Sequence, residues 1–283
     1  MLIKVNELLM DATQNRYGVP AINVINVETA HYAALAAERE HMPIIIQYYP
    51  GFKDYAPLSV IAGAAKYFAE RSSVPIAVHQ DHSAGYKIAI EGIRDGFPSV
   101  MVDGSSLPYE ENVALTKSVV DVADVFNVDI EAELGHVGIG ANAEDFVTDD
   151  FYTNPSQVAE FVERTGCGSL AIAVGNAHGP YVKVPKLDFE RIEQCREAVD
   201  IPLVMHGCSD IPTDQLQRAV NLGMSKFNIA TEYFRAMYRS LERGIGSREH
   251  DGDGVGLMMG IEEDCIAFVV DKIQVLNPNH YSM

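Results

Sequence analysis

Three short apolar runs of the chain each end in a histidine. These histidines are His82, His178 and His206. Neutral imidazoles are common zinc ligands, and three protein ligands with one open position make a catalytic metal site. No HExxH-type spacing links the three residues, so such a site requires a fold that brings the three runs together.

Carboxylates accompany these histidines. Asp81 directly precedes His82, where a carboxylate can serve as a metal ligand, as a partner of a ligand, or as a general acid and base. Asp103 and Glu133 end two further apolar runs and could bind a second metal position or orient the histidines. Taken singly, each acid would as readily be a helix cap or a solvated loop residue.

The other histidines have weaker contexts. His79 has the strand parity of Asp81 but lies deeper in its run, so we expect a packed residue or a partner of a ligand. We expect His136 to be a surface group, as we do the remaining histidines, His31, His41, His250 and His280.

The runs that carry these groups alternate with helical stretches. Eight strand-like runs are apolar on both faces, as parallel strands covered by helices must be. Strict alternation predicts an α/β protein, and eight units predict closure into a (β/α)8 TIM barrel with extra C-terminal helices. An open doubly wound sheet is the alternative, but no GxGxxG motif follows the first run. The expected runs are 21–26, 42–47, 74–82, 99–105, 128–135, 169–178, 201–206 and 226–232.

No linker divides the chain, so we expect one domain over residues 1–283 with a C-terminal helical extension over 233–283. Residues 138–150 are rich in glycine and acids and too many for an ordinary βα loop, which predicts a mobile active-site loop. Active sites of such barrels lie at the C-terminal ends of the strands. All eight runs end in polar groups, which places the candidate site there.

Candidate phosphate-binding groups follow the last two runs. Gly207 and Ser209 precede one helical stretch, and Asn228 and Thr231 precede the next. Barrels often hold a phosphate at this place with backbone N–H groups and helix N-termini. By composition alone, these residues could equally be ordinary loop and cap residues.

The composition of the chain argues against nucleic acid and membranes as binding partners. The chain has 283 residues, 47% of them hydrophobic, and a net charge of -19, so it can bury a core and is a poor partner for nucleic acid. Its four cysteines lack CxxC spacing, which fits a reducing compartment. No apolar run approaches the roughly 18 residues of a membrane span, and the N-terminus lacks a signal-peptide layout. We therefore expect a cytoplasmic protein without membrane contact.

The order and spacing of these motifs resemble the class II (metal-dependent) ketose-bisphosphate aldolases, the fructose- and tagatose-bisphosphate aldolase family. The resemblance runs nearly end to end. It is carried by HQDH at 79–82, SVMVDGS at 99–105, EAELG at 131–135, AHGPY at 177–181 and MHGCSDIP at 205–212.

The resemblance implies an enzyme of carbohydrate metabolism, such as glycolysis. The enzyme would reversibly cleave a ketose 1,6-bisphosphate of fructose or tagatose type to dihydroxyacetone phosphate and an aldehyde such as glyceraldehyde 3-phosphate. Asp81 would move the proton at the C4 hydroxyl, and Glu144, within the 138–150 loop, the proton at C3.

The resemblance also implies a metal-binding set. Zinc, or cobalt or another divalent metal in its place, would bind His82, His178 and His206, polarise the ketose carbonyl and stabilise the enediolate. Asp103 and Glu133 would form an alternative metal position. Sodium or potassium would bind the carbonyls of Gly179 and Gly207, and the chain would form a homodimer or homotetramer. The implied substrate and phosphate ligands are Asn23, Gly179, Lys183, Gly207, Ser209, Asn228 and Thr231.

Three residues depart from the pattern of the family. Tyr49 stands where a small serine is expected, and Cys208 and Asp210 replace two glycines of the phosphate loop. We expect Asp210 to point away from the phosphate and cap the following helix. No residue matches the C-terminal arginine that some relatives use on the second phosphate.

These departures leave the substrate open. The alternatives are a class II aldolase acting on another phosphorylated ketose, a non-catalytic sugar-phosphate-binding protein, and a metal-dependent epimerase or isomerase. Asp81 and Glu144 argue against the non-catalytic alternative, because a silent relative has no need of both.

Overall fold

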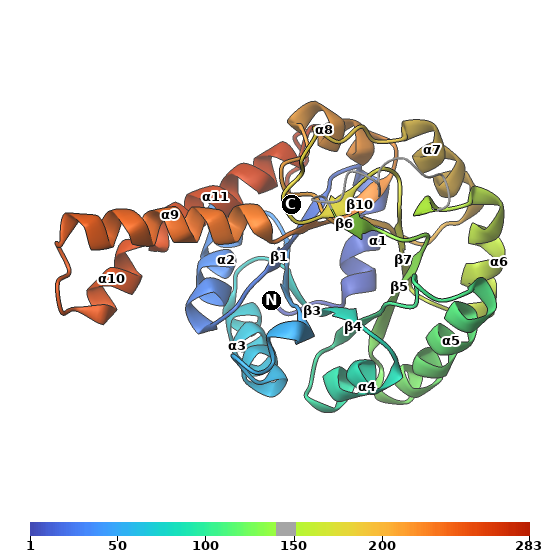
Figure 1. Cartoon of the computed structure of the whole chain (residues 1–283), viewed down its shortest axis with the longest axis horizontal. Helices are drawn as coiled ribbons and strands as arrows, with labels where there is room; N and C mark the ends of the chain where they lie inside the picture. The colour runs from blue at the N-terminus through green and yellow to red at the C-terminus, as the bar shows by residue number, and fades with distance from the viewer. Residues whose placement is uncertain (140–150) are drawn as a thin grey trace.

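Eight parallel strands close into a barrel in the order β1-β10-β9-β7-β5-β4-β3-β2. The structure, a computed structural model, describes residues 1–139 and 151–283 (Figure 1). The predicted TIM barrel is confirmed. The barrel strands are β1 (Val19–Asn23), β2 (Ile44–Tyr48), β3 (Ile76–Ser83), β4 (Ser99–Val102), β5 (Asp129–Leu134), β7 (Ser169–Ile172), β9 (Leu203–Met205) and β10 (Met224–Ile229).

Helices between the strands cover the outside of the barrel (Figure 1). Strands such as β2 are buried on both faces, which explains why their sequences are continuous apolar runs. The covering helices are α2 (Val27–Glu40), α3 (Leu58–Arg71), α4 (Tyr86–Arg94), α5 (Tyr109–Phe126), α6 (Pro155–Thr165), α7 (Phe189–Ala198) and α8 (Thr213–Asn221). A short 3-10 helix, η1 (Pro50–Phe52), follows β2.

The first helix, α1 (Val5–Asn15), lies against the N-terminal ends of the strands. The backbone N–H of Asn6 donates to Oδ2 of Asp129 at 3.0 Å, at the start of β5. The hydroxyl of Thr13 lies 2.5 Å from that of Ser225, near the start of β10. This end of the barrel is therefore covered, and the opposite end is open for a site.

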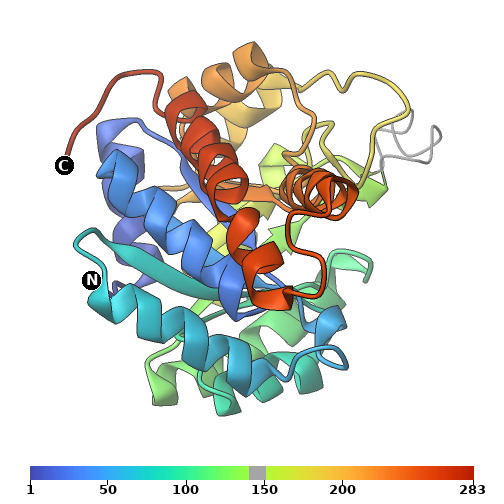
Figure 2. The ribbon, with the colours of Figure 1, turned by 90° about the vertical axis from the view of Figure 1, so that its left-hand side faces the viewer.

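Three helices follow β10. The first, α9 (Thr231–Ser247), projects away from the barrel, and α10 (Gly254–Gly260) lies at its far end. The last, α11 (Glu262–Val275), returns beside α2 (Figures 1 and 2). Arg39 of α2 holds Glu263 of α11 with two hydrogen bonds, which ties the returning helix to the barrel.

The sixth predicted strand is two strands, not one. Its barrel part, β7, ends at Ile172, and His178 lies on β8 (Ala177–His178), which pairs with β6 (Gly138–Ile139) in a separate sheet. Gly175 separates β7 from β8 with a φ of 97°, and a Cβ there would meet the carbonyl oxygen of Lys186 at 2.7 Å. The sequence did not predict this break, because the residues on both sides of Gly175 are buried and the apolar run continues across it.

Candidate active site

A bulge in β3 brings Asp81 and His82 to the same cavity. Consecutive residues of a regular strand point to opposite faces. Here the register against β4 shifts between Gln80 and Ser83, and His82 has a φ of 32°, in the left-handed region that non-glycine residues rarely adopt. Because a bulge re-aims side chains, both residues line one cavity of about 520 Å³.

The three predicted histidines converge at this point. Nδ1 of His206 lies 2.7 Å from Nε2 of His82, and the His82 and His178 rings have centroids 4.7 Å apart. One ligand nitrogen from each of the three residues fits within a group whose atoms lie no more than 4.8 Å apart. His82 comes from β3, His178 from β8 and His206 from the residue after β9.

The nitrogens of His82 and His206 that face away from one another are occupied by carboxylates. Nδ1 of His82 lies 3.0 Å from Oδ2 of Asp103, and Nε2 of His206 lies 2.9 Å from Oε1 of Glu131. A histidine that donates one N–H to a carboxylate keeps its other nitrogen available as a metal ligand. The chemistry of this donor set, two imidazole nitrogens turned toward one another with His178 beside them, therefore fits a divalent metal.

A buried charge pair stands behind His206. Oε2 of Glu131 accepts a hydrogen bond from Nζ of Lys226 at 2.8 Å, and both side chains are fully buried. His79 is buried next to this pair, with its Nδ1 2.8 Å from Oγ of Ser99 and its Nε2 3.7 Å from Oε2 of Glu131. The expected interior packing of His79 is confirmed. The role of Lys226 was missed, although a lysine within an apolar strand is a signal that a buried acid lies nearby.

Three amide side chains surround the carboxylate of Asp81. Asn23 and Asn228 donate to its two oxygens at 3.0 and 3.1 Å, and Gln47 lies at 3.4 Å. Burial opposes ionisation of Asp81, but the charges of His82 and other neighbours outweigh it and lower its pKa. The group is therefore a carboxylate at neutral pH. The amide oxygens of the three residues are buried without partners.

The three histidines differ in charge. Burial and the charge of His82 lower the pKa of His178 to about 4, and the same two causes lower the pKa of His206 well below its usual value. Both are neutral at pH 7 and keep a free lone pair. Burial alone would lower the pKa of His82, but neighbouring carboxylates, Asp81 first, raise it to about 9.

Asp103 and Glu133 form a second group of candidate metal ligands with His82. Burial opposes ionisation of Asp103, but hydrogen bonds from His82 and Ser105 hold its pKa below the usual range. Burial and the charge of Asp103 raise the pKa of Glu133 to about 8. Oε2 of Glu133 is buried without a hydrogen-bond partner, 3.7 Å from Nδ1 of His206. An unpartnered buried carboxylate oxygen next to a ligand nitrogen suits a cation position.

The predicted substrate and phosphate ligands other than Lys183 line a smaller pocket that adjoins the first. Gly207, Ser209 and Asn228 meet Thr231 there, at the N-terminus of α9. Gly207 has a φ of 59°, and a Cβ at this position would meet the carbonyl oxygen of Ala177 at 2.0 Å, so only glycine fits. The pocket is lined by Asn23, Asp81, His178, Gly179, Gly207, Ser209, Asn228, Ala230 and Thr231.

The departures of the phosphate loop have simple structural explanations. Cys208 is buried and turns away, with its Sγ donating to the carbonyl of Met205 at 3.1 Å. Asp210 forms two hydrogen bonds with the guanidinium of Arg235, at 2.8 and 3.0 Å. The prediction that Asp210 caps the following helix was wrong, because α8 begins after Pro212 without a side-chain cap and the arginine on α9 takes the carboxylate instead.

Three other predicted residues have different outcomes. Lys183 is exposed and lines neither pocket of the site. Glu144 lies outside the described residues, as does most of the predicted 138–150 loop. His136 was expected at the surface, and this was wrong: it is half-buried, lines the larger cavity and has its Nδ1 3.1 Å from Oγ of Ser105. Its position in the sequence, just after β5 and three residues after Glu133, could have predicted that it lies at the site.

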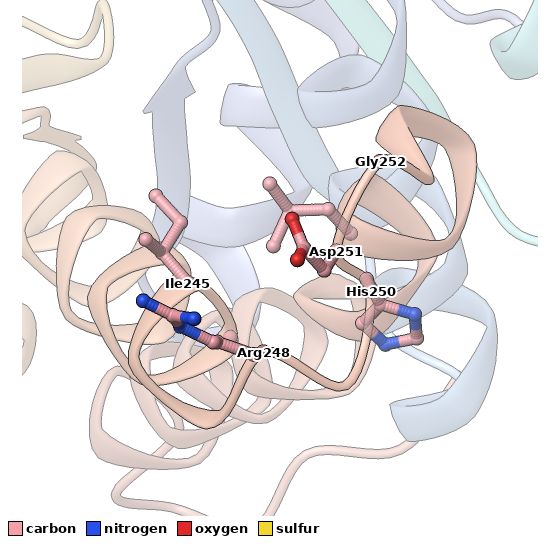
Figure 3. A pocket seen from close by; sticks show the side chains of 7 residues that line it. Ile245, Arg248, His250, Asp251 and Gly252 are labelled. Atoms are coloured by element: carbon pink, nitrogen blue, oxygen red, sulfur yellow. The ribbon is translucent and has the colours of Figure 1, made fainter.

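A separate hollow of about 410 Å³ lies between the end of α9 and α10 (Figure 3). Its lining includes Ile245, Arg248, His250 and Asp251. Both groups of candidate metal ligands found among the described residues contain His82, so this hollow is separate from the metal site.

Comparison with known proteins assigns the family. A model of the fructose-bisphosphate aldolase class II family matches residues 3–280. The chain belongs to this family. Among solved structures, the YdjI aldolase of Escherichia coli K12 is 32% identical, with a TM-score of 0.88 over 100% of both chains. A Coccidioides immitis protein proposed to be a fructose-1,6-bisphosphate aldolase is 30% identical, with a TM-score of 0.84 over 97% of this chain and 96% of that one.

A fructose-bisphosphate aldolase of Campylobacter jejuni shares the fold, with 23% identity and a TM-score of 0.84 over 98% of this chain and 95% of that one. Membership of the class II aldolase family makes the protein an aldolase that acts on a phosphorylated sugar, forms dihydroxyacetone phosphate and uses a divalent metal. No helix among the described residues is long and apolar enough to span a membrane.

Proposed function

We propose that this aldolase uses zinc, held by His82, His178 and His206, with Asp81 as the group that moves the proton of the C4 hydroxyl. The observation that carries the proposal is the facing pair of nitrogens, His206 Nδ1 and His82 Nε2, next to an ionised buried carboxylate. A divalent cation at this position supplies a Lewis acid for the ketose carbonyl.

Asp81 is suited to proton transfer. Its Oδ1 lies 3.9 Å from Nε2 of His82, so it lies beside the metal position without occupying it. In cleavage it accepts the proton of the C4 hydroxyl as the C3–C4 bond breaks, and in condensation it returns that proton to the aldehyde oxygen. Asn23 and Asn228 line the smaller pocket, and their amide N–H groups hold both oxygens of Asp81 in place there.

The C1 phosphate belongs in the smaller pocket. The backbone N–H groups at the start of α9 carry the positive end of a 17-residue helix, which favours an anion. Ser209 and Thr231 add hydroxyl groups, and Gly207 permits close approach of the loop. This arrangement supports dihydroxyacetone phosphate as the half of the substrate that stays bound next to the metal.

The test combines metal removal with substitution of Asp81. A chelator should abolish the release of dihydroxyacetone phosphate, and zinc or cobalt should restore it. Asp81→Asn preserves the shape of the side chain but not its basicity, so kcat should fall by about 10²–10⁴-fold while bound zinc is unchanged.

Asp121→Asn is the matched control, because Asp121 is an exposed acid of α5 that pairs with Lys117. It should behave as the unmodified enzyme. Full turnover in excess chelator would refute the metal assignment, and normal turnover of Asp81→Asn would refute the proton-transfer role.

Other assignments stay predictions. They are the role of Glu144 at C3, the 138–150 active-site loop, the contact of Lys183 with substrate, the sodium or potassium at the Gly179 and Gly207 carbonyls, the division of the chain into one barrel and a 233–283 extension, the homodimer or homotetramer, and the cytoplasmic location. The carbonyl of Gly207 accepts a hydrogen bond from the hydroxyl of Tyr181 at 2.9 Å, so a cation would share that oxygen.

A further inference from the structure

One wall of the larger cavity is aromatic. Tyr49 follows β2 and packs edge-on against Phe52 of η1, with ring centroids 5.2 Å apart and planes at 89°. Phe52 in turn packs against Phe234 of α9 at 6.1 Å. The three rings line the larger cavity but not the small phosphate pocket. The aromatic wall, Tyr49, Phe52 and Phe234, therefore faces the part of the substrate that lies beyond the C1 half.

Tyr49 is available for a ligand. Its side chain is 39% exposed, which is high for an aromatic residue in a cavity wall. Gly51 makes this position possible, because a Cβ at Gly51 would meet Cε1 of the Tyr49 ring at 2.2 Å. An exposed ring that the local backbone holds over a cavity offers apolar contact to a carbon chain.

The described lining of the larger cavity lacks the side chains that usually bind a terminal phosphate. It includes Asp81, Asp103, Glu133 and three histidines, but no lysine or arginine. Arg235 follows Phe234 in the chain, but both arms of its guanidinium are held by Asp210.

A terminal phosphate needs cationic or N–H donors to replace its water. The small pocket supplies N–H groups for the C1 phosphate, whereas the described lining of the larger cavity supplies no lysine or arginine for a second phosphate. It offers three aromatic rings to a carbon chain instead.

We propose that the substrate is a ketose 1-phosphate whose aldehyde half carries no phosphate, and that the aromatic wall contacts the carbon chain of that half. This inference depends on the proposed function for the C1 half. If the inference is correct, the substrate is a different phosphorylated ketose from the 1,6-bisphosphate that the family resemblance implies.

The test is condensation of dihydroxyacetone phosphate with matched aldehydes on the zinc-loaded enzyme. The panel pairs glyceraldehyde with glyceraldehyde 3-phosphate and erythrose with erythrose 4-phosphate. We expect kcat/KM to be at least about tenfold higher for the uncharged member of each pair, since the described lining offers no lysine or arginine to replace the water that the phosphate loses. A preference for the phosphorylated members, or no reaction with any uncharged aldehyde, overturns the proposal.

Tyr49→Ala tests the aromatic wall. Loss of the ring should raise KM for erythrose by about tenfold and leave kcat within a factor of about two. Tyr55→Ala is the matched control, because Tyr55 is an exposed tyrosine that does not line the cavity. Equal KM values for the Tyr49→Ala and unmodified enzymes would refute the proposed contact between Tyr49 and the aldehyde.

Two further measurements distinguish a failure of the proposed function from a failure of the substrate inference. Exchange of the C3 proton of dihydroxyacetone phosphate in deuterated water, without aldehyde, reports the C1 half alone. If the enzyme catalyses neither proton exchange nor condensation, the proposed function is refuted. If exchange is normal but phosphorylated aldehydes are preferred, only this inference is refuted. If that preference disappears in Arg235→Ala, Arg235 leaves Asp210 and binds the second phosphate.

Discussion

At the scale of the residue, the buried pair Lys226 and Glu131 orients a proposed metal ligand, His206. Removing two charges from water costs several kcal/mol per ion, so a fully buried pair persists only with good hydrogen bonds. One oxygen of Glu131 accepts from Lys226, and the other meets Nε2 of His206. The pair therefore holds the proton of His206 on Nε2 and directs Nδ1 toward His82.

Glu131→Gln should weaken both metal binding and stability. We expect zinc affinity to fall about 10–100-fold, as for other carboxylates that orient a metal-binding histidine. The metal-free protein should lose about 3–5 kcal/mol, because Lys226 is left buried without a counter-charge. Competition with a chelating dye measures the affinity, and urea unfolding measures the stability.

A double variant separates the two effects. Glu131→Leu with Lys226→Met removes both charges and should recover most of the stability, since apolar replacement of a buried pair is often neutral. Its zinc affinity should stay low. Unaltered zinc affinity in Glu131→Gln would show that His206 needs no such orientation.

At the scale of the element, local irregularities place the reactive groups. The bulge in β3 turns Asp81 and His82 to one cavity, and the break at Gly175 frees His178 to join β8. Gly207 lets the loop after β9 pass close to β8, where its backbone approaches the carbonyl of Ala177. Each feature departs from regular strand geometry at the point where a ligand or proton must be handled.

Gly207→Ala should impair substrate binding. A Cβ at this position would force the loop away from β8 and would also require a left-handed φ, at a cost of about 1–3 kcal/mol. Since 1.4 kcal/mol is a factor of ten, KM for the phosphorylated ketose should rise about tenfold or more. Steady-state kinetics provide the measurement.

Gly252→Ala is the control for this change. Gly252 also has a positive φ, 78°, but a Cβ there meets nothing within 4 Å and the residue lies beyond α9. It should lose some stability and keep its KM. A similar KM for both variants would show that the loop at Gly207 tolerates displacement.

At the scale of the whole molecule, the metal joins distant parts of one barrel. Its three proposed ligands span residues 82 to 206 and come from β3, β8 and the end of β9. The unfolded chain cannot offer this arrangement, so zinc should bind the folded state alone and raise Tm. At a free concentration 100 times Kd the gain is about 2.7 kcal/mol, or several degrees for a chain of this size.

Differential scanning fluorimetry with and without zinc measures this shift. His178→Ala should lose most of it, whereas His280→Ala, at the C-terminal tail, should keep it. An equal shift in the two variants would place the stabilising zinc elsewhere.

The barrel was predictable because its signal is local and repeated. Eight apolar runs alternate with helical stretches, and near-continuous apolar runs are typical of parallel strands covered by helices. The predicted sixth strand was wrong in extent because Ala173 and Val174, after its end, are as buried as the strand itself. The cap role of Asp210 was wrong because its partner, Arg235, lies 25 residues away on another helix.

The sequence by itself determined the chemical inventory: three histidines, Asp81, a phosphate loop and the order of motifs that implies a class II aldolase. Tertiary structure alone decided which nitrogen of His206 faces His82 and that Lys226 and Glu131 lie behind it. It also decided that Tyr49 belongs to an aromatic wall of a cavity without a described lysine or arginine. The reason is that composition and spacing are properties of neighbours in the chain. Ligand direction and the charge of a cavity depend on residues that meet only when the barrel closes.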